Sequence, residues 1–295
     1  LGPAVAGLFI ASLGWAPNYW TVALMVLAGG AGMASFHPQA SSRATAGLPN
    51  RSRWMAVFIS AGTLGVAAGP VYFSTLFRTM GLKGAAIGAL PSVLATVLLV
   101  FLLSDGESGS EARRAPFDWR PLAAVWQPLT ILYLLVFIRS VIQISFMQFL
   151  VLYLHRERAM PLEAASWALS AYVAAGALGG LAGGNLADRF GGKRIIQISM
   201  LGCLPFLALF YTTTGVVSIA CLTLGGLLLL FTIPVNVVMA QELAPTQSGT
   251  VSALMMGFAW GMAGLIFIPL TGWIADRSSL GLALAAQTAL PFLGF

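Results

Sequence analysis

Charge is the property that this sequence has least of. Only 8% of its 295 residues are charged, whereas 58% are hydrophobic, and the mean hydropathy is +0.88. A soluble domain carries about 25% charged residues, so this chain has too few to cover its surface for water. The shortage excludes a water-soluble globular protein and predicts a protein that lies in a lipid bilayer.

Cysteine and histidine are nearly absent, with two residues of each. Cys203 and Cys221 both lie in apolar stretches, where cysteine acts as a small packing residue, so we expect neither a disulfide framework nor a metal site. The sequence has no P-loop, no H-E-x-x-H motif and no nucleophile elbow, and no acid lies deep in an apolar run. We therefore expect no ATP-driven pump, no enzyme and no cofactor.

Long apolar runs are what the sequence has in abundance. About ten of them approach the roughly 20 residues that a membrane helix requires. Their approximate limits are 1–15, 19–42, 54–77, 84–104, 125–154, 163–184, 194–214, 216–240, 249–274 and 280–295. The polar stretch SDGESGSEARRAPFDWR, residues 104–120, separates the first four runs from the last six. The sequence thus predicts an all-α membrane protein with an N-terminal bundle at 1–104, a cytoplasmic linker at 105–124 and a C-terminal bundle at 125–295.

Basic residues set the expected orientation. Placing the linker on the cytoplasmic side puts most of the loop Lys and Arg residues on that side, as the positive-inside rule requires. The same loops explain the net charge of +6 at an anionic membrane surface, so we expect no nucleic-acid partner. Because the chain begins and ends inside apolar runs, we expect both ends to be truncated. Two equal halves would then place two missing helices before Leu1.

A charged segment, GNLADRFGGKR, interrupts the apolar runs at residues 184–194. Asp188 lies near a helix end, where it can pair with a base or with the positive end of a neighbouring helix. Any multi-pass protein has short basic turns, but the spacing G-x-L-A-D-R-x-G-x-K-R resembles the cytoplasmic loop signature of the major facilitator superfamily. One position departs from it, because Gly192 stands where the family usually has a base. The resemblance implies a conformational role for this loop. The residues in that role are Gly184, Asp188, Arg189, Gly191, Lys193 and Arg194.

Further stretches extend the resemblance along the chain. Residues 62–70, GTLGVAAGP, are similar to the glycine-rich fifth helix of the superfamily, which is associated with antiporters, and residues 241–253 are similar to its loop between helices ten and eleven. Residues 36–44, FHPQASSRA, and residues 137–154 resemble the fosmidomycin-resistance-like branch. The resemblance implies the major facilitator fold, with the visible runs as helices 3–12 of 12 in two pseudo-symmetric bundles.

The sequence also repeats part of the charged segment. GWIADR at residues 272–277 matches the G-x-[LI]-A-D-R pattern of residues 184–189. The two copies fall at matching positions of successive three-helix units but on opposite membrane faces, which is typical of inverted repeats. A chance similarity over so few residues is the alternative.

Arg139 is the most informative polar residue inside an expected span. It lies about 14 residues into a run of about 30, which at ~1.5 Å per residue puts it near the middle of the bilayer. An arginine there costs several kcal/mol if it faces lipid, so we expect it to face a wet cavity or a partner. Gln143 follows one turn later on the same face, and together they offer donors for a carboxylate, phosphate or phosphonate. The alternative is a structural arginine tied to helix-end carbonyls or to an acid outside the visible runs.

Other residues are candidates for coupling or gating. His37 titrates near neutrality and could carry a coupling proton, although a lone histidine is more often a packed residue. Pro234 precedes Asn236 by two residues, which predicts a polar bend that is either a gate or a passive kink. Small residues predict close helix packing, which is either static or a surface on which the two halves slide. These residues are Gly65, Gly69, Pro70, Gly176 and Gly180.

We therefore expect a secondary transporter that works by alternating access. The favoured version is proton-coupled efflux of a small anionic or amphipathic compound, such as a drug. The alternatives are proton-coupled uptake of a nutrient such as a sugar or organic acid, and a non-transporting receptor or scaffold. The expected partners are a small-molecule substrate, protons and the lipid bilayer, and the expected form is a monomer in the bacterial cytoplasmic membrane.

Overall fold

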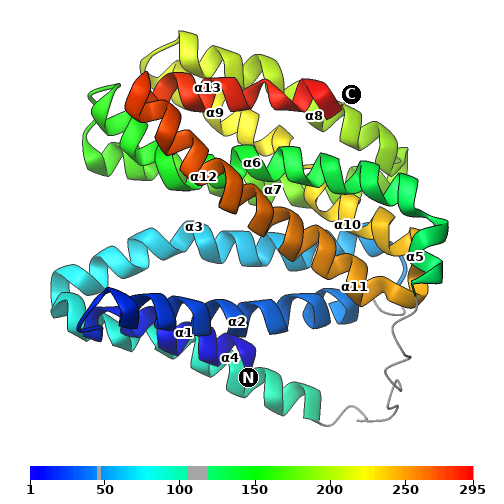
Figure 1. Ribbon diagram of the computed structural model, residues 1–295, viewed down its shortest axis with the longest axis horizontal. Helices are drawn as coiled ribbons and strands as arrows, with labels where there is room; N and C mark the ends of the chain where they lie inside the picture. Colours follow the sequence, from blue (N-terminus) through cyan, green and yellow to red (C-terminus); the bar gives the residue numbers. More distant parts are fainter. Residues whose placement is uncertain (45–47, 105–118, 295) are drawn as a thin grey trace. The chain divides into compact units, whose positions relative to one another are not determined.

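The computed structural model describes residues 1–44, 48–104 and 119–294, and every regular element in these ranges is helical (Figure 1). The expected all-α class is therefore confirmed. In the described ranges, seven helices are long and apolar enough to cross a bilayer, and three shorter apolar helices accompany them. The shorter three are Gly2–Trp15, Arg53–Gly69 and Leu280–Gly294. Together the long and the short helices fall on the apolar runs of the sequence.

The helices pack as two units. The amino-terminal unit comprises Leu1–Ala40 and Gly69–Ala123, and the carboxyl-terminal unit comprises Ser41–Ala68 and Ala124–Phe295. The described residues between 41 and 68 therefore belong to the carboxyl-terminal unit, whereas the sequence predicts an N-terminal bundle at 1–104. Helix α3 (Arg51–Gly84) begins in one unit and ends in the other. The bundle limits expected from the sequence stay a prediction.

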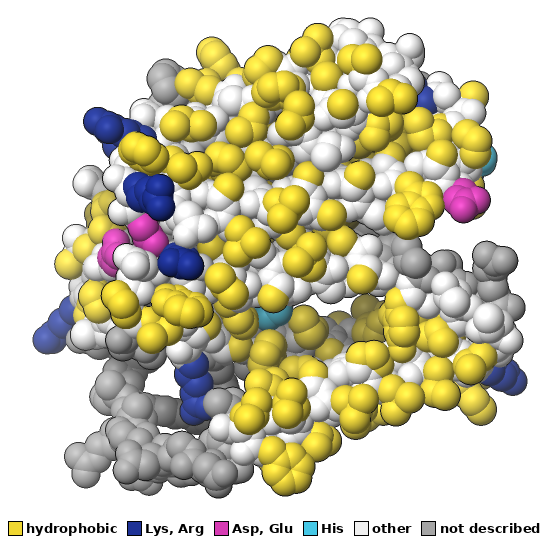
Figure 2. Space-filling view, turned by 180° about the vertical axis from the view of Figure 1, so that it is seen from behind, with side chains coloured by type: hydrophobic (Ala, Val, Ile, Leu, Met, Phe, Trp, Pro, Cys, Tyr) yellow, Lys and Arg dark blue, Asp and Glu magenta, His cyan; other side chains and the backbone are white. Residues whose placement is uncertain are grey.

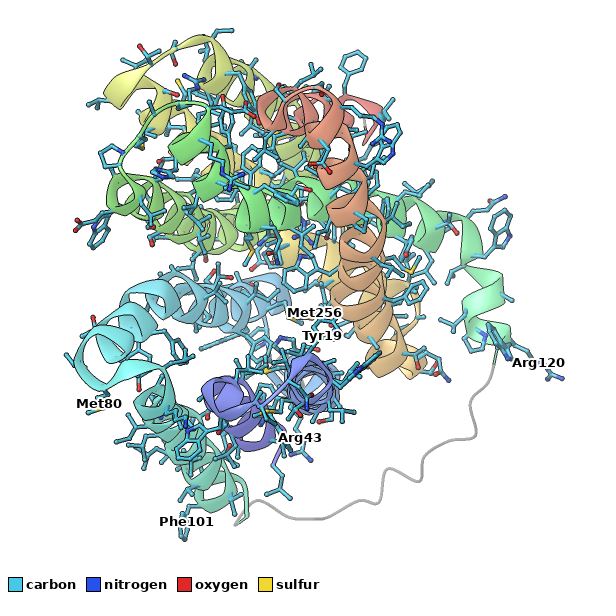
Figure 3. All side chains as sticks on the ribbon, turned by 60° about the vertical axis from the view of Figure 1, so that its left-hand side comes forward. Tyr19, Arg43, Met80, Phe101, Arg120 and Met256 are labelled. Carbon is cyan, nitrogen blue, oxygen red and sulfur yellow. The ribbon has the colours of Figure 1, made fainter. Side chains whose placement is uncertain are left out.

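The amino-terminal unit contains α1 (Gly2–Ala11), α2 (Tyr19–Ala44), the end of α3 and α4 (Leu90–Ser104), with 3-10 turns at Ser12–Trp15 and Ala85–Ala89. Asn18 caps α2, because its Oδ1 accepts a hydrogen bond from the Thr21 backbone N–H at 2.9 Å. Figure 3 shows Met80 and Phe101 at the periphery of this unit, where their side chains are 53% and 70% exposed. Large apolar side chains in such positions are suited to contact with lipid.

The carboxyl-terminal unit is the larger one. Its helices are α6 (Trp126–Arg156), α7 (Leu162–Phe190), α8 (Gly192–Thr212), α9 (Gly215–Leu229), α10 (Thr232–Leu243), α11 (Ser248–Ser252), α12 (Ala259–Arg277) and α13 (Leu280–Thr288), with 3-10 turns at Pro245–Gln247 and Leu290–Gly294. The short helix α5 (Arg120–Ala124) lies at the boundary between the units, which falls after Ala123. A π-helical segment, Ala253–Phe258, joins α11 to α12. Figure 2 shows hydrophobic side chains spread over the visible face, with charged side chains gathered towards its edges.

Glycines let α7 lie directly against α9 and the turn that follows it. A Cβ at Gly179 would lie 2.0 Å from the Leu227 carbonyl oxygen, and a Cβ at Gly183 would lie 2.3 Å from the Phe231 carbonyl oxygen. Real Cβ atoms do not approach backbone atoms this closely, so only glycine permits the contact. These two glycines serve the internal packing of one unit.

Two consecutive charged residues after α6 hold three helices together. Glu157 accepts hydrogen bonds from the first turn of α13, and Arg158 donates to the end of α8 and to the Tyr153 hydroxyl. The donors to Glu157 are the backbone N–H groups of Leu280 and Gly281, at 2.6 and 2.9 Å. The carbonyl acceptors of Arg158 are Phe210, Tyr211 and Thr213, at 2.9, 2.8 and 2.7 Å. The acid thus meets the positive end of one helix and the base meets the negative end of another.

Candidate functional site

The charged loop forms the connection between α7 and α8. Gly191 has a φ of 88°, which only glycine adopts without strain, and this allows the chain to turn within one residue. Asp188 lies in the last turn of α7, and its Oδ2 accepts a hydrogen bond from the backbone N–H of Arg53 at 3.2 Å. Arg53 belongs to the first turn of α3, the partially positive end of that helix, and its N–H also donates to the Asn50 carbonyl oxygen at 3.0 Å. Asp188 was expected to pair with a base or with the positive end of a neighbouring helix, and in the structure it contacts the positive end of α3.

The remaining loop residues divide into packed and exposed ones. Gly184 is buried, whereas Arg189, Lys193 and Arg194 are exposed, as suits contact with lipid headgroups or water. Gly192 is at a close approach between α8 and α10, because a Cβ there would lie 2.5 Å from the Met239 sulfur. This contact gives a physical reason for glycine at a position where the superfamily signature usually has a base.

A second contact between α3 and α7 lies deeper in the carboxyl-terminal unit. The buried Ser60 hydroxyl donates to the Ala177 carbonyl oxygen at 2.7 Å. Gly180, one of the predicted packing residues, is beside it, because a Cβ at Gly180 would lie 3.0 Å from Ser60 Oγ. The first half of α3 is therefore attached to α7 at two levels, once at Asp188 and once at Ser60.

The other predicted packing residues behave differently from one another. A Cβ at Gly176 would lie 2.3 Å from the Leu230 side chain, so this glycine packs inside the unit. At Gly65 and Gly69 no atom of the described residues lies within 4 Å of a Cβ position, and the packing role expected of them stays a prediction. Pro70 lies within α3, and its side chain is outside the described part of the chain.

Arg139 lies in the middle of α6 and is turned into the carboxyl-terminal unit. It is only 6% exposed, and its Nη1 donates to the Gln143 side-chain oxygen. The structure thus brings together the two polar residues that the sequence places on one helix face. Arg139 Nε has no hydrogen-bond partner among the described residues. A buried guanidinium with a free donor is able to bind an anion or a water molecule.

Tyr172 on α7 is a further polar residue near this centre. It is fully buried, and its hydroxyl has no partner within the described ranges. Its ring packs against Phe146, with 5.3 Å between the ring centroids. Tyr172 precedes Gly176 by one helical turn, so the glycine spacing of α7 was a usable signal for the face that it occupies.

His37 and Asn236, the other predicted site residues, lie apart from the Arg139–Gln143 pair in the chain. His37 is on α2 in the amino-terminal unit, half-buried beside Phe36, with 6.0 Å between the ring centroids. Asn236 is on α10 and fully buried, and neither atom of its amide has a partner in the described ranges. Such an unsatisfied amide is costly unless water or a ligand reaches it.

The predicted bend at Pro234 coincides with a break between helices. α9 ends at Leu229 and α10 begins at Thr232, which places Pro234 in the first turn of α10, where proline is tolerated. The Ser199 hydroxyl on α8 lies 2.6 and 3.2 Å from the carbonyl oxygens of Leu228 and Leu229 beside the break. A side chain of a neighbouring helix thus adds a donor to carbonyls that also accept from the Phe231 N–H at 3.2 Å and from the Thr232 hydroxyl at 3.3 Å.

The described residues include no group of three His, Cys, Asp or Glu side chains that could hold a metal ion. Cys203 and Cys221 are both buried and are not joined by a disulfide. The polar groups that the structure collects are therefore hydrogen-bond donors and acceptors inside a membrane protein, and they suit ligand binding and conformational change.

Comparisons with known proteins agree with this architecture. Residues 1–269 match the family described as Major Facilitator Superfamily. The fosmidomycin resistance protein of Escherichia coli (strain K12) is 30% identical over 304 residues, covering 98% of this chain and 72% of that protein. An uncharacterized MFS-type transporter, YfnC of Bacillus subtilis (strain 168), is 29% identical over 304 residues, covering all of this chain (100%) and 74% of that protein.

Solved structures share the fold at lower identity. The fucose:proton symporter FucP of E. coli superposes with a TM-score of 0.74 at 14% identity, covering 99% of this chain and 80% of that one. A bacterial homologue of the iron transporter ferroportin, in an outward-facing state, superposes with a TM-score of 0.70 at 16% identity, with the same coverage of 99% and 80%. At these identities the likeness concerns the fold alone.

Proposed function

We propose that this chain, which belongs to the Major Facilitator Superfamily, is a secondary transporter that exports a small anionic or amphipathic compound in exchange for protons. The chain is a multi-pass integral membrane protein. In the proposed cycle the transporter alternates between a state that is open to one membrane face and a state that is open to the other. The substrate binds in one state and is released in the other. The proposed site of action is the bacterial cytoplasmic membrane, and the proposed form is a monomer.

The observation that carries the proposal is the buried Arg139–Gln143 pair. A guanidinium stays charged at every physiological pH, so burying it is costly unless a negative group or several polar groups compensate. Gln143 occupies one donor of Arg139, while Nε remains free among the described residues. A free, preorganised donor on a buried cation favours an anionic ligand over a neutral one. Export, as opposed to uptake, is supported by the similarity to a protein named for fosmidomycin resistance.

Asp188 has a conformational role in this proposal. Its bond to the first turn of α3 stabilises the state in which α3 and α7 are held together at the end of α7. When this bond is released, the Ser60–Ala177 bond is the remaining described hydrogen bond between the first half of α3 and α7. His37, on α2, is the proposed carrier of the coupling proton among the described residues, because histidine titrates near neutral pH.

Proton-coupled uptake of a sugar or organic acid is the alternative transporter function, and a receptor or scaffold is the non-transporting alternative. The family fixes neither the direction of transport nor the substrate, so flux measurements must decide. Fosmidomycin, the compound in the name of the E. coli relative, is a suitable first probe.

Everted membrane vesicles with an acidic interior provide the test. The wild-type protein is expected to accumulate radiolabelled fosmidomycin in the interior, and dissipating the pH gradient is expected to abolish this accumulation. Arg139→Gln is expected to lower probe binding by tenfold or more, because it removes a charged donor. Arg43→Gln is the matched control, since Arg43 is an exposed arginine at the end of α2. Accumulation only when the external medium is the acidic side would contradict export, and unchanged binding by Arg139→Gln would assign that residue a structural role.

A further inference from the structure

A hollow lies where the ends of α6 and α12 meet the start of α13, at one end of the carboxyl-terminal unit (Figure 1). Its volume is about 210 Å³, and Phe149, Leu152 and Leu280 form an apolar part of its lining. Gly272 and Ala275, from the second G-x-[LI]-A-D-R copy, also line it, and their small size leaves the space open. The hollow is smaller than the roughly 300–1,000 Å³ of drug-sized sites, so it suits a small group.

Three charged residues line the same hollow, namely Arg156, Glu157 and Asp276. Glu157 is already compensated, because its carboxylate oxygens accept from the backbone N–H groups of Leu280 and Gly281 at 2.6 and 2.9 Å. Arg156 and Asp276 take part in no hydrogen bond or ion pair among the described residues, not even with one another. The hollow therefore presents one cation and one anion that are too far apart to neutralise each other.

The other charged groups near the hollow are engaged elsewhere. Arg158 donates to carbonyl oxygens at the end of α8. The Arg277 guanidinium lies 4.1 Å from the centroid of the Trp273 ring and donates to the Trp273 carbonyl oxygen at 3.2 Å. The His155 ring lies 2.9 Å from a carbonyl oxygen of its own loop. None of these described groups supplies a partner to the cation or the anion of the hollow.

The hollow spans the depth of a lipid headgroup. Phe149 and Arg156 follow Arg139 by 10 and 17 residues, which at ~1.5 Å per residue are about 15 and 25 Å along α6. With Arg139 near the middle of a hydrocarbon core roughly 30 Å thick, Phe149 is at the edge of the core and Arg156 is among the headgroups. Trp273, in the last turns of α12, is 55% exposed, as is typical of aromatic residues at the membrane interface. The apolar part of the lining thus meets acyl chains, and the charged part meets headgroups.

A phosphate joined to a primary ammonium is the chemistry that fits these two charges. The Arg156 guanidinium offers forked donors that suit a phosphate, and an ammonium group brings three N–H donors to the Asp276 carboxylate. A choline headgroup has no N–H donor, and a glycerol headgroup brings no positive charge, so both leave Asp276 without a partner. A phosphate alone would add a second negative charge beside Asp276.

We propose that this hollow is a binding site for the headgroup of a phospholipid of the ethanolamine class. Arg156 binds the phosphate, Asp276 accepts from the ammonium group, and the acyl chains pass beside Phe149 and Leu152. The bound lipid bridges α6 and α12, which share no ion pair of their own at this hollow. A soluble zwitterion would carry the same two charges, but it would leave the apolar part of the lining unused. The site depends neither on the proposed substrate nor on the direction of transport.

The test measures lipid binding to the purified protein in detergent by native mass spectrometry. The protein is titrated with phosphatidylethanolamine, phosphatidylcholine or phosphatidylglycerol, all with dioleoyl chains, and the Kd of the first bound lipid is determined. The wild-type protein is expected to bind phosphatidylethanolamine roughly fivefold more tightly than either other lipid, the upper range for one exposed charge pair. Glycerophosphoethanolamine, the same headgroup without acyl chains, is expected to bind at least about tenfold more weakly, because it buries less apolar surface.

The variants separate the two charges. Asp276→Asn is expected to bring phosphatidylethanolamine and phosphatidylcholine to within about twofold, because only the ammonium contact is removed. Arg156→Gln is expected to weaken the binding of both lipids roughly fivefold, since both carry a phosphate. Asp276→Glu and Arg156→Lys keep the charges and are expected to keep the preference for phosphatidylethanolamine. Glu163→Gln and Arg194→Gln are the matched controls, because each removes an exposed charge outside the hollow, and both are expected to bind as the wild type does.

Three results would overturn the inference. The first is a wild-type protein that binds the three lipids within about twofold of one another, and the second is an Asp276→Asn variant that keeps the full preference for phosphatidylethanolamine. The third is binding of glycerophosphoethanolamine as tight as that of the lipid, which would assign the hollow to a soluble zwitterion.

Discussion

Replacing Arg158 by alanine is expected to destabilise the carboxyl-terminal unit by about 3 kcal/mol. Arg158 donates to three carbonyl oxygens at the end of α8 and to the Tyr153 hydroxyl, all between 2.7 and 2.9 Å. A hydrogen bond to a charged group contributes about 1.5–3 kcal/mol before solvent screening. Arg158 is only half-buried, so screening lowers each bond, and the freed carbonyls regain some water. Together these effects give a loss of about 3 kcal/mol in the free energy of unfolding when all the hydrogen bonds of the Arg158 guanidinium are removed.

The measurement is the free energy of unfolding in mixed micelles, from titration with a denaturing detergent and tryptophan fluorescence. Arg156→Ala is the matched control, because Arg156 is exposed, lies two residues earlier and donates to no helix end in the described ranges. Arg158→Lys is expected to lose at least half of the stabilisation, since an ammonium group cannot reproduce the planar fork that reaches several carbonyls. Equal losses for Arg156→Ala and Arg158→Ala would refute the assignment of the stabilisation to the α8 end.

The remaining predictions concern helix packing and the break between α9 and α10. Gly179→Ala is expected to reduce the free energy of unfolding by about 3 kcal/mol or more, because the added Cβ makes several strained contacts with the α9 backbone at ~1 kcal/mol each. Gly65→Ala is expected to be neutral or to stabilise α3 by up to about 1 kcal/mol. Equal changes in the free energy of unfolding for Gly179→Ala and Gly65→Ala would contradict the close backbone contact at Gly179. Ser199→Ala is expected to cost about 1 kcal/mol, because it removes one buried donor from two carbonyl oxygens that keep the Phe231 N–H and the Thr232 hydroxyl as donors. Ser166→Ala is its control, with an expected change within about 0.5 kcal/mol, since that hydroxyl is exposed and bonds only within its own helix.

The helices were predictable from the sequence because their signals are local. A run of apolar residues long enough to cross the bilayer must be helical, since lipid offers no partners for backbone groups. The turn at Gly191 was likewise marked by the charges around it and by the glycine itself, although α7 continues to Phe190, beyond the expected helix end at residue 184. Even the pairing of Arg139 with Gln143 follows from spacing alone, because residues four apart lie on one helix face.

Features that depend on which helix faces which were not predictable. The sequence offered Asp188 a base or a helix end, and only the packing of α3 against α7 places the Arg53 N–H beside it. Tyr172 and Ser199 are polar residues in apolar helices, and the groups that their hydroxyls face are set by helix rotation about the axis, which hydropathy does not specify. The π-helical segment Ala253–Phe258 carries no proline and no charge, so nothing in its composition distinguishes it from regular helix.

The Glu157–Arg158 pair has a consequence for how this protein can change over evolutionary time. Exposed loops usually tolerate insertions and deletions, because little depends on their register. Here a shift of one residue after α6 would bring a base to the positive end of α13 and would move the guanidinium away from the end of α8. The positive end of α13 would then repel the base, and the hydrogen bonds to the carbonyl groups at the end of α8 would be lost. The length of this short surface connection is therefore expected to vary less among relatives than its exposure suggests, and exchanging the two residues is expected to be more harmful than deleting either charge.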